Sequence, residues 1–170
     1  MVDVIQKKSA ITMATAYIET TIPSLYTGRP AQNLVEAARQ YLTRVWWDHH
    51  RYEFDLVCSQ TVLDECAEGD SEMARRRIEL LEGIPLLDLT DNVVSIAEML
   101  LANQIIPPKA ADDAIHIAVA SVHQIDYLVT WNCKHLANPR NWRRISDCVA
   151  EFGFRATVIC TPEDLIGDEN

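Results

Sequence analysis

Ala14-Thr15-Ala16-Tyr17-Ile18-Glu19-Thr20-Thr21 is the stretch that decides the fold. Its first five residues form a short apolar run of the kind that a buried β-strand shows, and Glu19 follows where the strand ends. Thr20 and Thr21 can cap a following helix. A strand that leads into a helix is the repeating unit of an α/β fold. It also places an acidic side chain at the carboxyl end of a strand, where such sheets gather functional groups.

The rest of the chain repeats this alternation of short apolar runs and helical patterns. Further strands are expected over residues 54–58, 86–89, 127–130 and 157–160. Helices are expected over residues 33–49, 59–69, 71–81, 92–103, 110–123 and 141–152, with a last short helix that begins at Thr161. Short strands alternating with helices predict a three-layer α/β/α fold with a mostly parallel central sheet of about five strands. Residues 1–12 are expected to be an N-terminal extension and residues 13–170 a single domain, since ~100–200 residues per domain is usual.

Composition narrows the class of protein. The chain has 170 residues, of which 48% are hydrophobic and 24% charged, a balance typical of a globular protein. Its formal net charge of −10 counts against a broad basic surface for nucleic acid. The arginines at Arg75, Arg76 and Arg77 are interpreted as an ordinary solvated helix face. No apolar run approaches the ~20 residues that span a bilayer. The N-terminus lacks an apolar leader segment, so we expect a cytoplasmic protein without membrane contact.

The five cysteines are odd in number and never spaced Cys-x-x-Cys. This pattern argues against both a zinc site and a disulfide framework. Cys58 and Cys160 lie in apolar, strand-like runs, where a free thiol behaves as a small hydrophobic side chain. We therefore expect both in the core.

Three acidic residues lie far apart in the sequence, at strand ends or helix starts: Glu19, Glu65 and Asp113. Two of them have an ordinary interpretation, because Glu19 can be an exposed acid near a helix N-terminus and Glu65 a solvated helix acid. Asp113 is more informative, since helical spacing groups it with the apolar residues Ile117 and Ala120. A carboxylate beside a buried face is costly unless it is paired or bound to metal. Together, converging carboxylates would form an all-oxygen site for Mg²⁺ or Mn²⁺.

Asn132 comes directly after the strand expected over residues 127–130, at the same edge of the sheet. Its amide could contribute an oxygen ligand or hold a metal-bound water. Trp131 beside it is a candidate for base stacking, whereas Trp46 fits a helical apolar face and is expected in the core. His116 lies one turn from Asp113, and a hydrogen bond within the packing of the helix is preferred over a catalytic role. Lys134 and His135 could touch a phosphate or belong to a surface loop.

These residues carry a resemblance to the PIN domain, the nuclease fold of VapC-type toxins, over nearly all of residues 14–165. The family opens with a strand followed by Asp-Thr-Ser, which resembles Ile18-Glu19-Thr20-Thr21 here, and its second acid is a helical Glu, matched by Glu65. Its third acid begins an Asp-Ala-x-His-Ile-Ala helix, matched by residues 113–118. Its final Thr-x-Asn/Asp motif is matched by Thr130-Trp131-Asn132. The departures are Glu for the first Asp, and Asn132 where many members have another acid.

The resemblance implies a PIN-like metal-dependent endoribonuclease, with Mg²⁺ or Mn²⁺ as cofactor and RNA as substrate. By this similarity the catalytic residues are Glu19, Glu65, Asp113 and Asn132, the first three of which hold the metal. It also implies the toxin of a type II toxin–antitoxin pair, with an antitoxin protein as partner and a homodimer as the assembly. Substrate contacts are expected from four residues: Thr20, Ser24, Thr130 and Trp131.

Two other classes of function stay open at this point. One is a PIN-fold protein with little or no catalysis that acts by binding RNA or protein, favoured by the missing fourth acid and the acidic net charge. The other is a metal phosphatase on an unrelated α/β fold, which lacks an Asp-x-Asp pair here. Nucleotide-binding folds are disfavoured, because neither glycine-rich phosphate loop is present.

Overall fold

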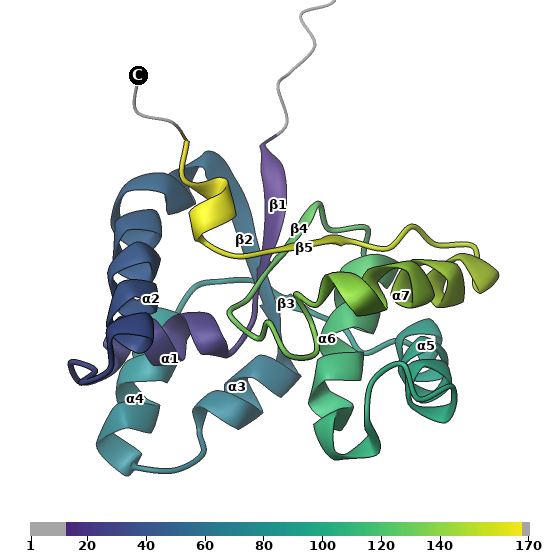
Figure 1. Ribbon diagram of the computed structural model, residues 1–170, viewed down its shortest axis with the longest axis horizontal. Coiled ribbons are helices and arrows are strands. Elements are labelled where there is room, and N and C mark those ends of the chain that lie inside the picture. The colour runs from purple at the N-terminus through teal and green to yellow at the C-terminus, as the bar shows by residue number, and fades with distance from the viewer. Residues whose placement is uncertain (1–12, 168–170) are drawn as a thin grey trace, which may run out of the picture.

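A sheet of five parallel strands forms the centre of the computed structural model, which describes residues 13–167 (Figure 1). The strand order is β3-β2-β1-β4-β5, and every pairing is parallel. The strands are β1 (Ala14–Ile18), β2 (Phe54–Ser59), β3 (Leu86–Leu87), β4 (Tyr127–Val129) and β5 (Val158–Cys160). The predicted three-layer α/β/α architecture with a mostly parallel sheet is confirmed. The expected extension at residues 1–12 lies outside the described residues.

Helices cover both faces of this sheet. The helices are α1 (Thr21–Thr27), α2 (Leu34–Val45), α3 (Gln60–Cys66), α4 (Ser71–Leu80), α5 (Asp91–Ala102), α6 (Ala111–Val122) and α7 (Pro139–Glu151). Figure 1 shows α1, α2 and α4 on one side of the strands and α5, α6 and α7 on the other, with α3 beneath the strand ends. None of the helices described is both long and apolar enough to cross a membrane.

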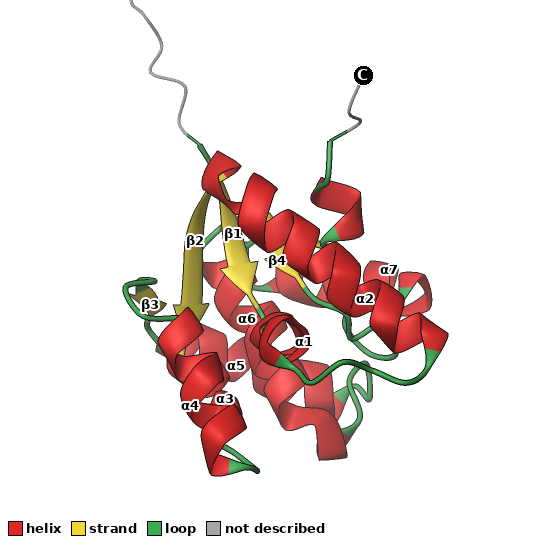
Figure 2. Ribbon diagram, turned by 90° about the vertical axis from the view of Figure 1, so that its left-hand side faces the viewer, coloured by secondary structure: helices red, strands yellow, loops and turns green. Residues whose placement is uncertain are grey.

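The middle strand, β1, sets the position of the site. It pairs with β2 on one side (Tyr17 opposite Val57) and with β4 on the other (Ile18 opposite Val129). The chain first fills the sheet on the β2 side and then returns to fill the β4 side, so the direction of winding reverses at β1. In open α/β sheets, ligands bind at such a reversal, outside the carboxyl ends of the strands. Figure 2 shows β1 running directly into α1 at this end.

The core lies between the sheet and the two helical layers. Tyr17, Ile18 and Leu128 of the central strands are fully buried, as is Trp46, which was expected in the core. Cys58 and Cys160 are also buried, which confirms their predicted packing role. No disulfide joins the cysteines of the described chain.

The helix expected over residues 33–49 is α-helical only to Val45 and continues as a π-helical turn, Trp46–His50. Two further elements are shorter than predicted. The strand expected over residues 86–89 contains only Leu86 and Leu87, because its partner β2 ends at Ser59, opposite Leu87, and gives way to α3. The last helix is a single 3-10 turn, Glu163–Leu165. There Thr161 donates from both its backbone N and its Oγ1 to Oδ2 of Asp164, at 2.8 and 2.7 Å, and closes the turn locally.

Candidate metal centre

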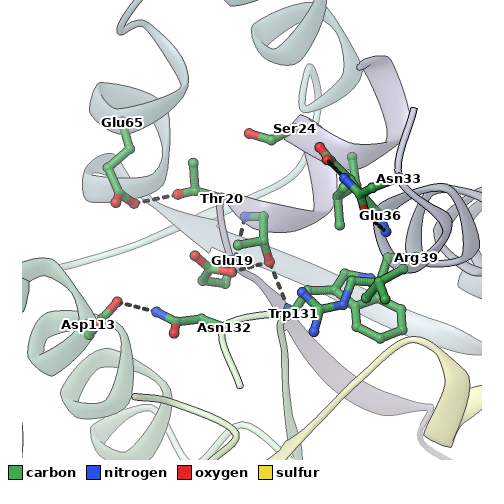
Figure 3. Close-up of a pocket in the computed structure, with 13 residues that line it drawn as sticks. Glu19, Thr20, Ser24, Asn33, Glu36, Arg39, Glu65, Asp113, Trp131 and Asn132 are labelled. Atoms are coloured by element: carbon green, nitrogen blue, oxygen red, sulfur yellow. Dashed lines mark hydrogen bonds between the residues drawn. The ribbon is translucent and has the colours of Figure 1, made fainter. Parts of the chain in front are cut away.

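Glu19 lies at the end of β1 with a side chain that is almost fully buried, at 3% exposure. Three donors hold one of its carboxylate oxygens, Oε2. They are the backbone N of Thr21 at 3.0 Å, the Thr21 hydroxyl at 2.5 Å and the Thr130 hydroxyl at 2.7 Å. Within residues 13–167, no hydrogen bond reaches the other oxygen, Oε1. In Figure 3 that oxygen faces the space between Glu65 and Asp113.

Glu65 enters this space from α3, and a buried chain of hydrogen bonds fixes it. Its Oε2 lies 2.9 Å from Nε2 of His116 and accepts a further bond from the Thr20 hydroxyl. Because a carboxylate only accepts, the His116 Nε2–H is the donor. The opposite ring nitrogen, Nδ1, lies 2.9 Å from the Tyr17 hydroxyl, which in turn contacts Ser59 Oγ at 2.6 Å. His116 is therefore buried and hydrogen-bonded on both ring nitrogens to residues of other elements, one of which is the candidate metal ligand Glu65.

Asp113 approaches from α6 and is held on both oxygens. Asn132 Nδ2 donates to Oδ1 at 2.9 Å, and His135 Nδ1 donates to Oδ2 at 2.7 Å. The Asn132 amide oxygen accepts from the backbone N of His135 at 3.2 Å. Asn132 therefore turns its amide nitrogen toward the site and acts through Asp113, not as an oxygen ligand.

The remaining candidates fall into two groups. Thr20, Ser24 and Trp131 line the cleft together with the three acids and Asn132. Thr130 does not line the cleft, because it is fully buried behind Glu19 and its hydroxyl donates to the Glu19 carboxylate. The expectation that Thr130 contacts substrate is corrected accordingly: its observed role is to position the first acid.

Glu19, Glu65 and His116 bring one ligand atom each within 4.8 Å of one another, in the part of the chain that the structure describes. Two carboxylates this close repel by about 3 kcal/mol at an effective dielectric constant of ~20. A divalent cation would relieve this repulsion, and oxygen donors suit Mg²⁺ or Mn²⁺. Both nitrogens of His116 are already hydrogen-bonded, so the donors that fit are the Glu19 and Glu65 carboxylates. Asp113 lines the same cleft but does not belong to this close group, so it would hold an ion through water.

Burial dominates the protonation equilibrium of Glu19. Burial raises the pKa of its carboxyl above the usual range, and it outweighs the opposing effects of nearby His116 and of the hydrogen bonds from Thr21 and Thr130. The ionised form is therefore costly in the protein alone. A cation beside the free oxygen would favour the ionised form.

Glu65 and His116 behave as an ion pair. Burial is the largest influence on the Glu65 pKa and raises it, but the hydrogen bond and charge of His116, with the Thr20 hydroxyl, lower it overall. Burial likewise acts most strongly on His116 and favours its neutral form. The bond to Glu65 and the charges of Glu19, Glu65 and Asp113 nevertheless raise the pKa of His116. The pair therefore favours ionised Glu65, the form that binds metal.

These side chains border an open cleft of about 640 Å³, shown in Figure 3. The acids lie on one side of it, and the start of α2 closes the other side with Asn33, Val35, Glu36 and Arg39. Arg39 was not assigned to the site from the sequence, because its helix, α2, carries no motif that marks a site. The supporting roles of Tyr17 and Ser59 were missed because the hydrogen bonds of Tyr17 join positions 99 and 42 residues apart.

Comparison of the chain with protein-family models, curated proteins and solved structures gave no match. The resemblance to the PIN domain therefore depends on the sequence matches at Glu19, Glu65, Asp113 and Thr130 alone.

Proposed function

We propose that this protein is a metal-dependent endoribonuclease of the PIN type, with Glu19, Glu65 and Asp113 as the residues that hold Mg²⁺ or Mn²⁺. The observation that carries the proposal is the buried Glu19 carboxylate. Three donors hold one of its oxygens, and the other faces a cleft that Glu65 and Asp113 also line. Such an arrangement is costly without a cation and suits one well.

The residues around the acids would keep them in place during hydrolysis of a phosphodiester. Thr21 and Thr130 hold Glu19, His116 orients Glu65, and Asn132 with His135 orients Asp113. A metal ion bound here would supply Lewis-acid activation of the phosphate and of the attacking water. Ser24 lines the same cleft and is available to a phosphate oxygen.

The decisive experiment is incubation of purified protein with mixed RNAs and Mg²⁺ or Mn²⁺. We expect cleavage by the wild type that chelator abolishes, and at least about a hundredfold loss in Glu19→Gln and Glu65→Gln. The matched control is Glu82→Gln, an exposed acid after α4, which should cleave as the wild type does. Equal cleavage by wild type and Glu19→Gln would mean a contaminating nuclease and would overturn the proposal.

One observation favours a second candidate, a PIN-fold module that binds RNA or protein without cutting. Asn132 takes the place of a fourth acid, and both oxygens of Asp113 are already hydrogen-bonded. This candidate predicts RNA binding without cleavage at any concentration of Mn²⁺.

The assignment as a type II toxin, with a partner antitoxin and a homodimeric assembly, follows from the resemblance alone. It predicts that expression slows growth of the host cell, that Glu19→Gln removes the effect, and that a small neighbouring reading frame encodes a protein that binds this one. Expression without any effect on growth would argue against the toxin assignment.

A further inference from the structure

We propose that Arg39 is the anchor for a backbone phosphate of the nucleic-acid strand, held in the cleft by its stacking on Trp131. This inference extends the proposed function: it assigns to the acid-rich cleft the positive group that a polyanionic substrate needs. It concerns a phosphate other than the one at Glu19, Glu65 and Asp113, because Arg39 lines the opposite side of the cleft from these three acids.

Arg39 is the only lysine or arginine among the cleft-lining residues of the described chain. Its guanidinium carbon lies 5.4 Å from the centroid of the Trp131 ring, within the range of a cation–π contact. Its side chain makes no hydrogen bond or ion pair with any residue from 13 to 167. Glu36, one turn earlier on α2, accepts from Asn33 instead. The donors of the guanidinium fork are therefore free to bind a phosphate.

Trp131 is suited to hold Arg39 rather than to stack on a base. Its side chain is only 8% exposed, and Arg39 covers one face of the ring. The indole Nε1 donates to the buried Thr43 hydroxyl at 2.8 Å, which fixes the plane of the ring against α2. The ring thus fixes the position of the guanidinium before any substrate arrives.

The same tryptophan ties this anchor to the acids. The backbone N of Trp131 donates to Thr21 Oγ1 at 2.8 Å, and that hydroxyl donates to Glu19. Arg39 is thereby connected to the first acid through Trp131 and Thr21 alone. A phosphate on Arg39 would set the position of the strand relative to the carboxylates, which is a geometric condition for cleavage at a defined bond.

The overall charge makes this single arginine important. The chain carries a net charge of −10, and the cleft contains four carboxylates at Glu19, Glu36, Glu65 and Asp113. Phosphate contacts supply most of the sequence-independent affinity of proteins for nucleic acid. Loss of the only cationic side chain in the cleft should therefore weaken strand binding strongly.

The test measures binding of a fluorescein-labelled oligoribonucleotide of about ten nucleotides, in the range of single-strand binding sites. Glu19→Gln serves as the background, so that the strand stays intact. We expect Arg39→Gln added to this background to raise Kd about tenfold or more. It should also reduce the slope of log K against log[salt] by about 0.7, the value for one phosphate contact on a single strand. Arg39→Lys should recover only part of the affinity, because a lysine lacks the planar fork.

Two controls separate this inference from the proposed function. Arg143→Gln, an exposed arginine on α7, should leave both Kd and the salt slope unchanged. In the otherwise wild-type protein, Arg39→Gln should not lower affinity for Mn²⁺, measured by calorimetry. Unchanged oligonucleotide binding in Arg39→Gln, with RNA cleavage by the wild type intact, would overturn this inference alone. Failure of the wild type both to bind and to cleave RNA would overturn the two proposals together.

Discussion

Burial and charge are in conflict at Glu19. A carboxylate that is 3% exposed is costly to ionise, because burial takes its charge out of water. Here Thr21 and Thr130 supply three hydrogen bonds to one oxygen, yet burial still raises the pKa of the group. A residue that lowers the stability of the free protein in this way is characteristic of a functional site.

Replacement of Glu19 by glutamine should therefore stabilise the protein in the absence of divalent ions. The unfolded-state pKa of a glutamate is about 4.3, and the folded-state pKa lies above it. The wild type thus loses stability as the pH rises from about 4.3 through the folded-state pKa, whereas glutamine shows no such loss. We expect Glu19→Gln to melt higher than the wild type at pH 7, by about 2–4 °C for each kcal/mol recovered.

Thermal unfolding with chelator, at several pH values, measures this difference. The difference in melting temperature between Glu19→Gln and the wild type should widen as the pH rises from 4.5 to the folded-state pKa of Glu19. It should reverse when Mn²⁺ is added in excess, since only the wild type gains stability by binding the ion. Glu82→Gln, at an exposed position, controls for the loss of one charge. A Glu19→Gln protein that melts lower than the wild type in chelator would show that the buried carboxylate is not under strain.

The role of His116 in orienting Glu65 can also be tested by mutation. With Nδ1 bonded to Tyr17 and Nε2 to Glu65, it should orient Glu65 without touching the ion. We expect His116→Gln to lower Mn²⁺ affinity about 10- to 100-fold, the usual effect of removing a residue that orients a ligand. Tyr17→Phe, which keeps the ring and removes only the hydroxyl, should have a smaller effect.

Electron paramagnetic resonance distinguishes this role from direct ligation. Bound Mn²⁺ in the wild type should show no coupling to a histidine nitrogen. Strong nitrogen coupling that disappears in His116→Gln would make His116 a ligand and would contradict the proposed donor set.

At the scale of elements, local patterns predicted most of the fold. The apolar run before Glu19 and the alternation of strands and helices were sufficient for the parallel sheet, because strand burial and helical spacing are properties of neighbouring residues. The length of β3 was not predictable, since it depends on where its partner β2 ends.

The site, too, was predictable where it depends on neighbouring residues and not where it depends on distant contacts. Residues at the ends of strands, such as Glu19, could be assigned from the sequence because parallel strands share one carboxyl edge. The contact between Tyr17 and His116 joins positions 99 residues apart, and nothing local in either segment encodes it. Asn132 was expected to provide an oxygen ligand. Its amide is oriented by the following loop, in which the backbone N of His135 donates to the amide oxygen.

A further prediction concerns a contact outside the cleft, between Thr15 of β1 and Asp126, the residue before β4. The backbone N and hydroxyl of Thr15 both donate to Asp126 Oδ2, at 2.8 and 3.0 Å. The bond from the Thr15 backbone lowers the pKa of Asp126, helped by the Thr15 hydroxyl and Arg155 and opposed by burial. Because the folded-state pKa is depressed, this contribution is present above the unfolded value of about 3.9 and is lost as the pH falls through the folded-state pKa.

We expect Asp126→Asn to reduce the free energy of unfolding by about 1 kcal/mol at pH 7. The difference from the wild type should shrink as the pH falls below about 3.9. Urea unfolding at a series of pH values measures both effects, with Asp55→Asn, an exposed aspartate of β2, as control. A pH-independent difference would show that the charge of Asp126 contributes nothing.

At the scale of the whole molecule, the three acids join segments that fold from distant parts of the chain: the end of β1, α3 and the start of α6. A cation shared by them would bind the folded state alone, because the unfolded chain does not bring these carboxylates together. Metal binding and global unfolding would therefore be linked, and the dependence of stability on metal concentration would report how many ions bind. For one ion that binds only the folded protein, stability rises by about 1.4 kcal/mol for each tenfold increase in free metal above Kd, and for two ions by twice as much.

We expect the value for one ion. Among the three acids of the described chain, only Glu19 and Glu65 belong to the group whose ligand atoms lie within 4.8 Å of one another. This one close pair of carboxylates suits one ion, which Asp113 would hold through water. The measurement is urea unfolding at stepped concentrations of free Mn²⁺, with the dependence on urea concentration (the m-value) expected to stay constant. Glu65→Gln should flatten the dependence on metal, and Glu82→Gln should preserve it. A rise near 2.8 kcal/mol per decade would instead mean that two ions bind, with Asp113 as a ligand of the second.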